Sequence, residues 1–536
     1  MNIKAAKEEL KHSISAYLAR DERGMLRIPY ERQRPILLMG PPGVGKTAIV
    51  RQIAEELKIN LVSYTITHHT RQSAIGLPRI EKRSFEGREF DVTEYTMSEI
   101  IAAVYRQRAL SGIKEGILFL DEINCVSETL QPTMLQFLQF KTFGTHQVPE
   151  GFVIVTAGNP PEYNQSVREF DIVTLDRLRR IDIEADYASF REYGFRRGLH
   201  GSIMAYLEIR KDRFYKLRAD VDRKEFVTAR GWEDLSDALK TYEALQLPVT
   251  EDLIGQYLQD RETASDFGIY YALYQKYALR YCVPDILAGR AGIPAELAQA
   301  PFDEKLSLIS LLSDALGGAF RRYCEAEDEA LALLAWLKEF GARLKMPAAR
   351  AGSAEEPGPA EKAGPAGEQS PAEELSPAAA QSPAELLRTM ISERMERFAR
   401  MKEAGMLSLE AEALERSLMS DARALPEEGA AQQAMQEPEA AFRFAAEWFD
   451  RREERRRQET EETGQSLSNA LHAVAGAFPG GQETVIFLTQ LNDSYHALRF
   501  VSEQGNEAYY HYNEMLLLKE RKDVLRQEAL KLADVL

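Results

Sequence analysis

The segment Gly40–Thr47 constrains the fold of this chain more than any other. It reads GPPGVGKT, follows the apolar run PILLM, and precedes AIVRQIAEEL, a sequence typical of a helix. A strand, a glycine-rich turn and a helix in this order are the setting in which GxxxxGK[ST] forms a phosphate-binding loop. Glycines let the backbone amides turn toward a phosphate, and the positive end of the helix dipole adds to the attraction. The segment therefore predicts a parallel α/β sheet that binds a nucleotide.

Two side chains of this loop have specific expected tasks. Lys46 would reach the β- and γ-phosphates, and the Thr47 hydroxyl would ligate Mg²⁺. We therefore expect ATP and Mg²⁺ as cofactors. The expected nucleotide-binding residues are Gly40, Pro41, Pro42, Gly43, Val44, Gly45, Lys46, Thr47 and Ala48.

An acidic pair ends a second apolar run. The segment GILFLDEIN places Asp121 and Glu122 at the C-terminal end of an otherwise apolar strand. Carboxylates are costly in such a position unless a cation lies nearby. Asp121 as a Mg²⁺ ligand meets that condition, and Glu122 would then orient and polarise an attacking water. The alternative is a solvated strand end before a helix N-cap, which the nearby phosphate loop disfavours.

A third apolar run is followed by an asparagine, whose side chain carries an amide. The segment FVIVTAGNPP ends in Asn159. In an open parallel sheet, ligands bind outside the carboxyl ends of the strands, so Asn159 should reach the same edge as Lys46 and Glu122. A neutral amide there can donate to the γ-phosphate or hold the water. The alternative is a loop asparagine that prepares the turn into Pro160 and Pro161.

Composition divides the chain at one place, from Met346 to about Glu385. This stretch consists mainly of Ala, Pro, Glu, Gly and Ser and has no aromatic or β-branched residue, so it cannot bury enough apolar surface to fold. Strands alternate with helices before it, then helical patterns follow. The expected regions are an αβα core with an N-terminal helix (1–185), an all-helical lid (186–345), a disordered linker (346–385) and a helical C-terminal region (386–536).

Charge and cysteine content exclude several classes of protein. The net charge of −17 argues against a general binder of nucleic acid or acidic membranes. Three widely separated cysteines give no zinc signature and suit a reducing compartment. No run approaches the ~20 apolar residues of a membrane span. We expect a cytoplasmic protein without a membrane span.

Four motifs together resemble a known family. GPPGVGKT, LFLDEIN, TAGNP and LDR occur, over roughly residues 30–240, in the order and spacing of AAA+ ATPases, and within these of the MoxR-like branch. The resemblance implies a P-loop NTPase fold with an AAA+ core, in which Asn159 matches the residue called sensor 1. It also implies two hairpin inserts, one in RIEKRSFEGREFDVTEYTM with its turn at Glu86–Gly87, the other in QFKTFGTHQVPEG.

The same resemblance assigns roles to arginines. Arg177, in TLDRLRR, matches the arginine finger that projects into a neighbouring subunit's nucleotide, with Arg179 and Arg180 as alternatives. Arg230, in FVTARGWEDL, matches sensor 2 and would reach the γ-phosphate of its own subunit from the first turn of a helix that Thr228 caps.

The resemblance further implies a motor that couples ATP hydrolysis to remodelling or assembly of protein partners. It implies a homo-oligomeric ring, expected to be a hexamer, and a client with a von Willebrand factor A-type domain. One alternative is a nucleic-acid motor or loader, which the acidic charge and the lack of a helix-turn-helix, OB or basic-arm segment disfavour. Another is a nucleotide-gated binding module with little turnover, which the complete set of nucleotide motifs disfavours.

Overall fold

The computed structural model describes most of the chain and divides it into two compact units. The described residues are 1–66, 76–85, 88–163, 170–219, 224–345, 382–405, 407–425 and 436–515. The expected turn at Glu86–Gly87 and residues 346–381 of the expected linker lie outside them. Unit 1 comprises Met1–Arg321, Glu403–Met406 and Glu462–Leu536, and unit 2 comprises Arg322–Lys402 and Leu407–Glu461.

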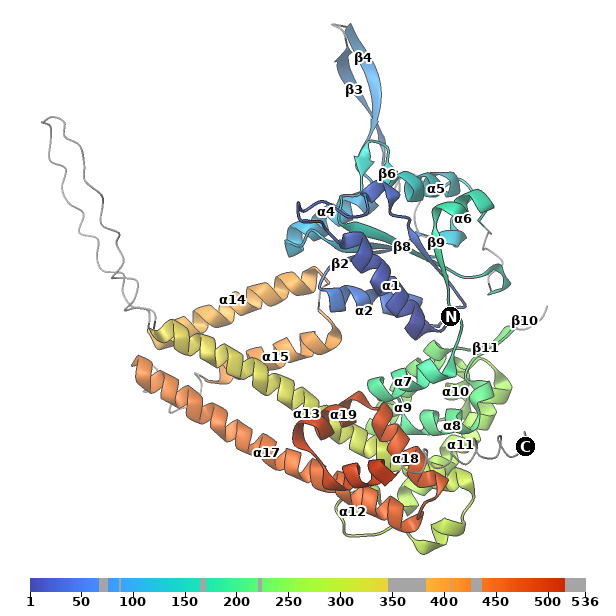
Figure 1. The fold of residues 1–536 in the computed structure, drawn as a ribbon, viewed down its shortest axis with the longest axis vertical. Helices are drawn as coiled ribbons and strands as arrows, with labels where there is room; N and C mark the ends of the chain where they lie inside the picture. Colours follow the sequence, from blue (N-terminus) through green and yellow to red (C-terminus); the bar gives the residue numbers. More distant parts are fainter. Residues whose placement is uncertain are drawn as a thin grey trace, which may run out of the picture. The chain divides into compact units, whose positions relative to one another are not determined.

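Unit 1 contains a five-stranded sheet in which every pairing is parallel (Figure 1). In spatial order its strands are β2 (Asn60–Thr65), β5 (Gly116–Asp121), β8 (Phe152–Gly158), β1 (Ile36–Met39) and β9 (Arg179–Asp182). Strand β1 lies between β8 and β9, and its last residue, Met39, pairs with Gly158 and with Asp182. The expected parallel α/β fold is confirmed, and β1, β5 and β8 occur at the three apolar runs that the sequence analysis identified.

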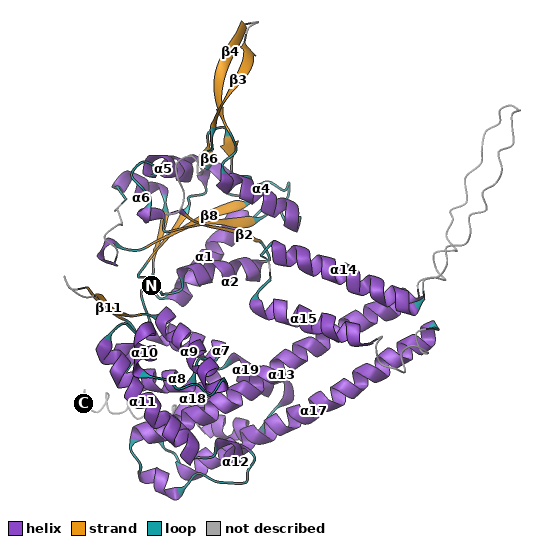
Figure 2. Ribbon diagram, turned by 180° about the vertical axis from the view of Figure 1, so that it is seen from behind, coloured by secondary structure: helices purple, strands orange, loops and turns teal. Residues whose placement is uncertain are grey.

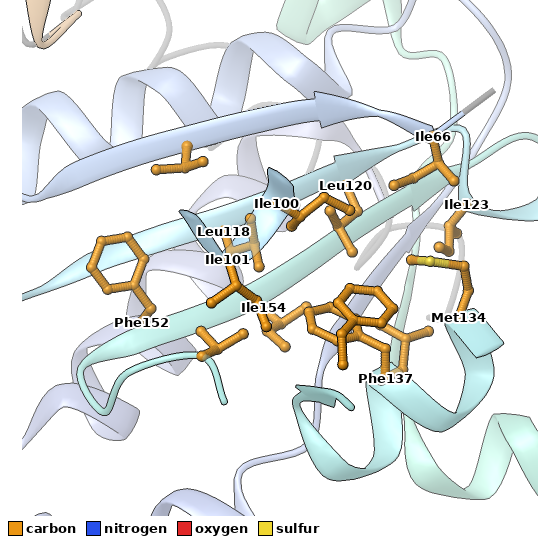
Figure 3. Packing of buried hydrophobic residues seen from close by; sticks show 14 of the residues in the cluster. Ile66, Ile100, Ile101, Leu118, Leu120, Ile123, Met134, Phe137, Phe152 and Ile154 are labelled. Carbon is orange, nitrogen blue, oxygen red and sulfur yellow. The ribbon is translucent and has the colours of Figure 1, made fainter. Parts of the chain in front are cut away.

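Alternating side chains bury both faces of this sheet. Ile36 and Leu38 face one apolar cluster, whereas Leu37 and Met39 face the other. The cluster that includes Ile36 packs under the expected N-terminal helix and the helix after the glycine-rich loop. The cluster that includes Leu37 packs under two further helices of the core (Figure 3). These helices are α1 (Ile3–Leu18), α2 (Lys46–Leu57), α4 (Glu99–Ser111) and α5 (Gln131–Phe140). Helices therefore cover both faces and leave the strand ends as the place for a site.

Both expected hairpin inserts are confirmed. The first consists of β3 (Pro78–Phe85) and β4 (Arg88–Tyr95), and it extends away from the sheet (Figure 1). The second consists of β6 (Thr142–Phe143) and β7 (His146–Gln147).

Helices dominate the region after β9, with one exception that corrects the expected all-helical lid. Strands β10 (Lys216–Ala219) and β11 (Lys224–Val227) form an antiparallel hairpin, of which β11 is visible in Figure 2. Each strand has only four residues, and the cross-strand pair Leu217–Phe226 is flanked by the charged residues Lys216, Arg218 and Glu225 and by Val227. So short an alternation is easily taken for part of a helix or loop. The helices of this region are α7 (Tyr187–Arg197), α8 (Gly201–Ile209), α9 (Ala229–Ala244), α10 (Glu251–Tyr257), α11 (Arg261–Arg280), α12 (Val283–Leu287) and α13 (Phe302–Lys345).

The last helices of the described chain belong to unit 1, which corrects the expected division at the linker. Helices α18 (Gln482–Asp493) and α19 (Tyr495–Gln504) contact α7, and the ring of Phe500 lies 5.2 Å from that of Phe320 in α13. Both rings are almost fully buried. Helical periodicity indicated that 386–536 is helical, but it does not reveal which helices pack together.

This packing predicts a loss of stability in the variant Phe500→Ala. Removing a buried phenyl ring typically costs about 3–5 kcal/mol, because the transfer free energy is lost and a cavity remains. We expect a clearly lower melting temperature than in Leu498→Ala, since Leu498 lies on the same helix with 44% of its surface exposed. Equal melting temperatures for the two variants would contradict the assignment of α19 to unit 1.

Unit 2 is helical in its described residues. It contains the second part of α13, together with α14 (Pro383–Glu403) up to Lys402, α15 (Leu409–Ala424) and the first part of α17 (Pro438–Ala477). Its core includes Trp336, Phe340, Leu387, Phe444 and Trp448. Across the described residues of both units, no helix is long and apolar enough to cross a membrane.

Candidate nucleotide site

The loop between β1 and α2 has a backbone that depends on two glycines. Gly43 has φ +73° and Gly45 has φ +97°, both in the left-handed region that other residues rarely adopt. A Cβ on Gly43 would also lie 2.8 Å from the Cβ of Thr228. Of the other predicted loop residues, Val44 is buried, while Ala48 is exposed in the first turn of α2.

Lys46 lies at the centre of the site. Its Nζ donates to the carbonyl oxygens of Gly40 at 2.8 Å and Pro41 at 2.9 Å, and to Oδ1 of Asn159 at 2.9 Å. Burial lowers the pKa of Lys46 to about 8; the charge of Arg230 lowers it too, against the opposing effect of Asp121. A buried ammonium ion that three oxygens hold is a strong anchor for phosphate.

A hydroxyl and a carboxylate meet beside this lysine. The Thr47 Oγ1 donates to Oδ2 of Asp121 at 2.9 Å, which joins the start of α2 to the end of β5. Glu122 follows in the left-handed conformation, with φ +55°, and its N–H donates to Oδ1 of Asp121 at 2.9 Å. A non-glycine residue in this conformation is uncommon and is often found at functional sites.

The oxygen atoms of Thr47 and Asp121 fit a magnesium ion. Mg²⁺ takes hard oxygen ligands and usually binds one or two carboxylates together with substrate phosphates. No group of three or more His, Cys, Asp or Glu residues suited to a metal occurs in the described residues. A site with one hydroxyl and one carboxylate would therefore hold the ion together with a nucleotide.

Asn159 lies where the sequence predicts it, directly after β8. Because Oδ1 of Asn159 accepts from Lys46, its Nδ2 group remains to donate. The Asn159 main-chain oxygen accepts from Nδ2 of Asn124 at 2.7 Å. The structure thus brings together the three strand ends that the sequence predicts at one edge.

Arg230 and Thr228 approach the same loop from the helical region. The expected cap is confirmed, because Thr228 Oγ1 accepts from the N–H of Gly231 at 3.2 Å at the start of α9. Arg230 lies exposed in the first turn, and its charge acts on Lys46. The expected position of Arg230 beside the phosphate loop agrees with this electrostatic effect.

Arg177 takes part in none of these contacts. It ends α6 (Ile172–Arg177) and is exposed, and within the described residues no hydrogen bond or ion pair joins it to Lys46 or Asp121. The two alternatives are engaged within the chain, since Arg179 pairs with Glu9 and Arg180 pairs with Asp182 at 2.8 Å.

Two residues of the site were missed by sequence reasoning. Asn124 belongs to the DEIN motif, so its position two residues after Glu122 was a usable signal. Tyr215 had none: it lies just before β10, and its hydroxyl donates to the carbonyl of Pro42 at 2.7 Å.

Part of the chain is similar in sequence to known proteins. Residues 36–177 match the family model described as ATPase family associated with various cellular activities (AAA). The chain is 25% identical over 338 residues to Lon protease of Bacillus thuringiensis (strain Al Hakam), which covers 58% of this chain and 39% of that protein. It is 29% identical over 132 residues to ATPase family gene 2 protein homolog B of Bos taurus, which covers 25% of this chain and 13% of that protein.

A solved structure of a RuvB mutant from Thermotoga maritima is also similar. It matches with 16% identity and a TM-score of 0.29 over 55% of this chain and 79% of that chain.

The chain spans well under half the length of the two curated relatives. Residues 36–177, the part of the chain that is similar to the AAA family model, contain the phosphate loop and the acidic strand end.

Proposed function

We propose that this chain is a Mg²⁺-dependent ATP hydrolase. The observation that carries the proposal is the meeting of Lys46, Asn159, Thr47 and Asp121 at the carboxyl edge of the sheet. Such an edge is where open parallel sheets bind nucleotides. Magnesium, held by Thr47 and Asp121, would supply positive charge that neutralises the phosphates.

The protein side chains divide the remaining work. Lys46 binds the β- and γ-phosphates, and the Asn159 amide donates to the γ-phosphate or to the attacking water. Glu122 orients that water and accepts its proton. Arg230 adds charge beside the γ-phosphate from α9. These roles account for a buried lysine that lies among oxygens and for a strained residue at position 122.

Steady-state ATP hydrolysis tests the proposal. We expect phosphate release that needs Mg²⁺ and stops in EDTA. Purified protein that binds ATP but releases no phosphate with Mg²⁺ present would contradict it.

The proposal extends to the protein's task in the cell. In it the chain is a cytoplasmic, MoxR-like AAA+ ATPase that assembles into a ring, expected to be a hexamer, and remodels protein partners, among them von Willebrand factor A-domain proteins. The exposed hairpin β3–β4 supports a protein client. It presents Ile80, which is 74% exposed, and the neighbouring rings of Phe85 and Phe90, 6.2 Å apart.

Client capture tests this extension. Glu122→Gln should hold ATP, and with it the client, for longer than the wild type. A pull-down with this variant and ATP should therefore enrich a partner that Lys46→Ala does not retain. Identical partner sets for the two variants would contradict a nucleotide-driven action on proteins.

The lowered pKa of Lys46 predicts that nucleotide binding weakens in alkaline solution. With a pKa of about 8 in the free protein, Lys46 is charged at pH 7 and loses its proton above pH 8. Bound phosphates favour the charged form of Lys46, so above pH 8 nucleotide binding is coupled to the uptake of a proton. The affinity for nucleotide should therefore fall by up to about tenfold per pH unit in this range. Titration with a fluorescent nucleotide from pH 7 to 9.5 measures this fall. Lys46→Arg is the control, because a guanidinium stays charged, and an equally flat profile in both proteins would refute the prediction.

A further inference from the structure

Asn124 makes a buried contact between two strand ends. It lies in the turn η3 (Ile123–Cys125) that follows Glu122, and its side chain is 5% exposed. Its Nδ2 donates to the main-chain oxygen of Asn159 at 2.7 Å. The turn after β5 is thus tied to the residue after β8.

The chain keeps space for this contact. A Cβ on Gly158 would lie 2.6 Å from Oδ1 of Asn124, so any side chain at 158 would displace the amide. Gly158 pairs with Met39, and its carbonyl accepts from the N–H of Gly40. The Asn124 contact therefore lies beside the backbone that enters the phosphate loop.

The contact leaves the second polar atom of the Asn124 side chain buried without a hydrogen bond in the described residues. Oδ1 of Asn124 has no hydrogen-bond partner in the described residues. An unsatisfied buried acceptor lowers stability, and such groups often occur where function requires the geometry.

We propose that Asn124 is a positioning residue, which holds Asn159 at a fixed distance from the segment that carries Glu122. The inference rests on the proposed ATPase function. The side chain of Asn159 is held by Lys46 and its main chain by Asn124, so this residue is fixed by two hydrogen bonds. Without Asn124, Asn159 would still contact Lys46 but would no longer be fixed relative to the Glu122 carboxylate that orients the water.

The test compares Asn124→Ala with Asn60→Ala. Asn60 is a matched control: it is fully buried, its Oδ1 is also unpartnered, and its Nδ2 donates to the carbonyls of Ile113 and Glu115. It lies at the start of β2, at the opposite edge of the sheet. We expect kcat to fall about 10- to 100-fold in Asn124→Ala, with KM changed less than about twofold, because misplacement of reacting groups affects the chemical step. Asn60→Ala should keep the wild-type kcat.

A second variant keeps the proposal testable if Asn124→Ala folds poorly. Gly158→Ala should lower kcat similarly, since the new methyl group displaces the Asn124 amide. A protein that carries both substitutions should be no slower than Asn124→Ala alone, because the methyl group then has space.

The outcomes separate the inference from the proposed function. A wild-type protein without ATPase activity would refute both the proposed function and the positioning role of Asn124. An active wild type, together with equal kcat in Asn124→Ala and Asn60→Ala or an unaffected Gly158→Ala, would overturn the positioning role alone.

Discussion

Lys46→Ala is expected to abolish nucleotide binding, whereas Glu122→Gln should bind ATP normally and hydrolyse it slowly. Lys46 supplies the buried positive charge of the loop, and its Nζ is already held among oxygens that direct it toward the site. Glutamine keeps the size of Glu122 but cannot take a proton from water, so kcat should fall by about 10²- to 10⁴-fold.

Fluorescent nucleotide titration and phosphate release separate the two effects. Lys141→Ala is the matched control, because Lys141 is also buried and its pKa is likewise lowered to about 8 by burial, yet it donates to the carbonyl of Tyr30. As long as its melting curve shows a folded protein, Lys141→Ala should bind nucleotide like the wild type. Equal losses of binding in Lys46→Ala and Glu122→Gln would refute the division of roles.

Arg177→Ala is expected to bind ATP but to lose about 10³-fold or more in hydrolysis rate. If Arg177 serves a neighbouring subunit, it stabilises charge that develops on that subunit's γ-phosphate. Its exposed position at the end of α6 leaves the guanidinium available to a second copy of the chain. Specific activity of the wild type should accordingly rise with protein concentration.

Mixing tests the shared site directly. The Arg177→Ala subunit binds nucleotide but lacks the arginine finger, whereas the Lys46→Ala subunit keeps Arg177 but binds no nucleotide. A mixture should therefore recover part of the activity wherever the nucleotide site of the first variant meets Arg177 of the second. Arg180→Ala serves as the control, because Arg180 already pairs with Asp182 and should retain most activity. Mixtures that stay inactive, with a rate per subunit independent of concentration, would argue against a site between subunits.

The sequence predicted the sheet edge because its signals are local. A strand that ends in a glycine-rich loop, an acidic pair or a single amide can be recognised from the sequence without knowledge of the rest of the fold. Parallel pairing then brings Lys46, Asp121 and Asn159 to one edge, and the structure agrees.

The features that were missed depend on contacts between distant segments. Tyr215 contacts Pro42, which lies 173 residues earlier in the chain, and the neighbouring strands β10 and β11 are too short to show a period. Helix α19 packs against α7 and against Phe320 of α13, and composition and periodicity do not encode such contacts between distant segments.

The contact between Phe320 and Phe500 also affects how the chain acquires its structure during synthesis. Phe320 leaves the ribosome roughly 180 residues before the ring that covers it, and at 5–20 residues per second that interval lasts about 10–40 s. Throughout this time the apolar surface beneath α19 lacks its natural cover, and all of unit 2 is translated in between. A nascent chain of this protein is thus open to aggregation or chaperone binding until its last helices emerge.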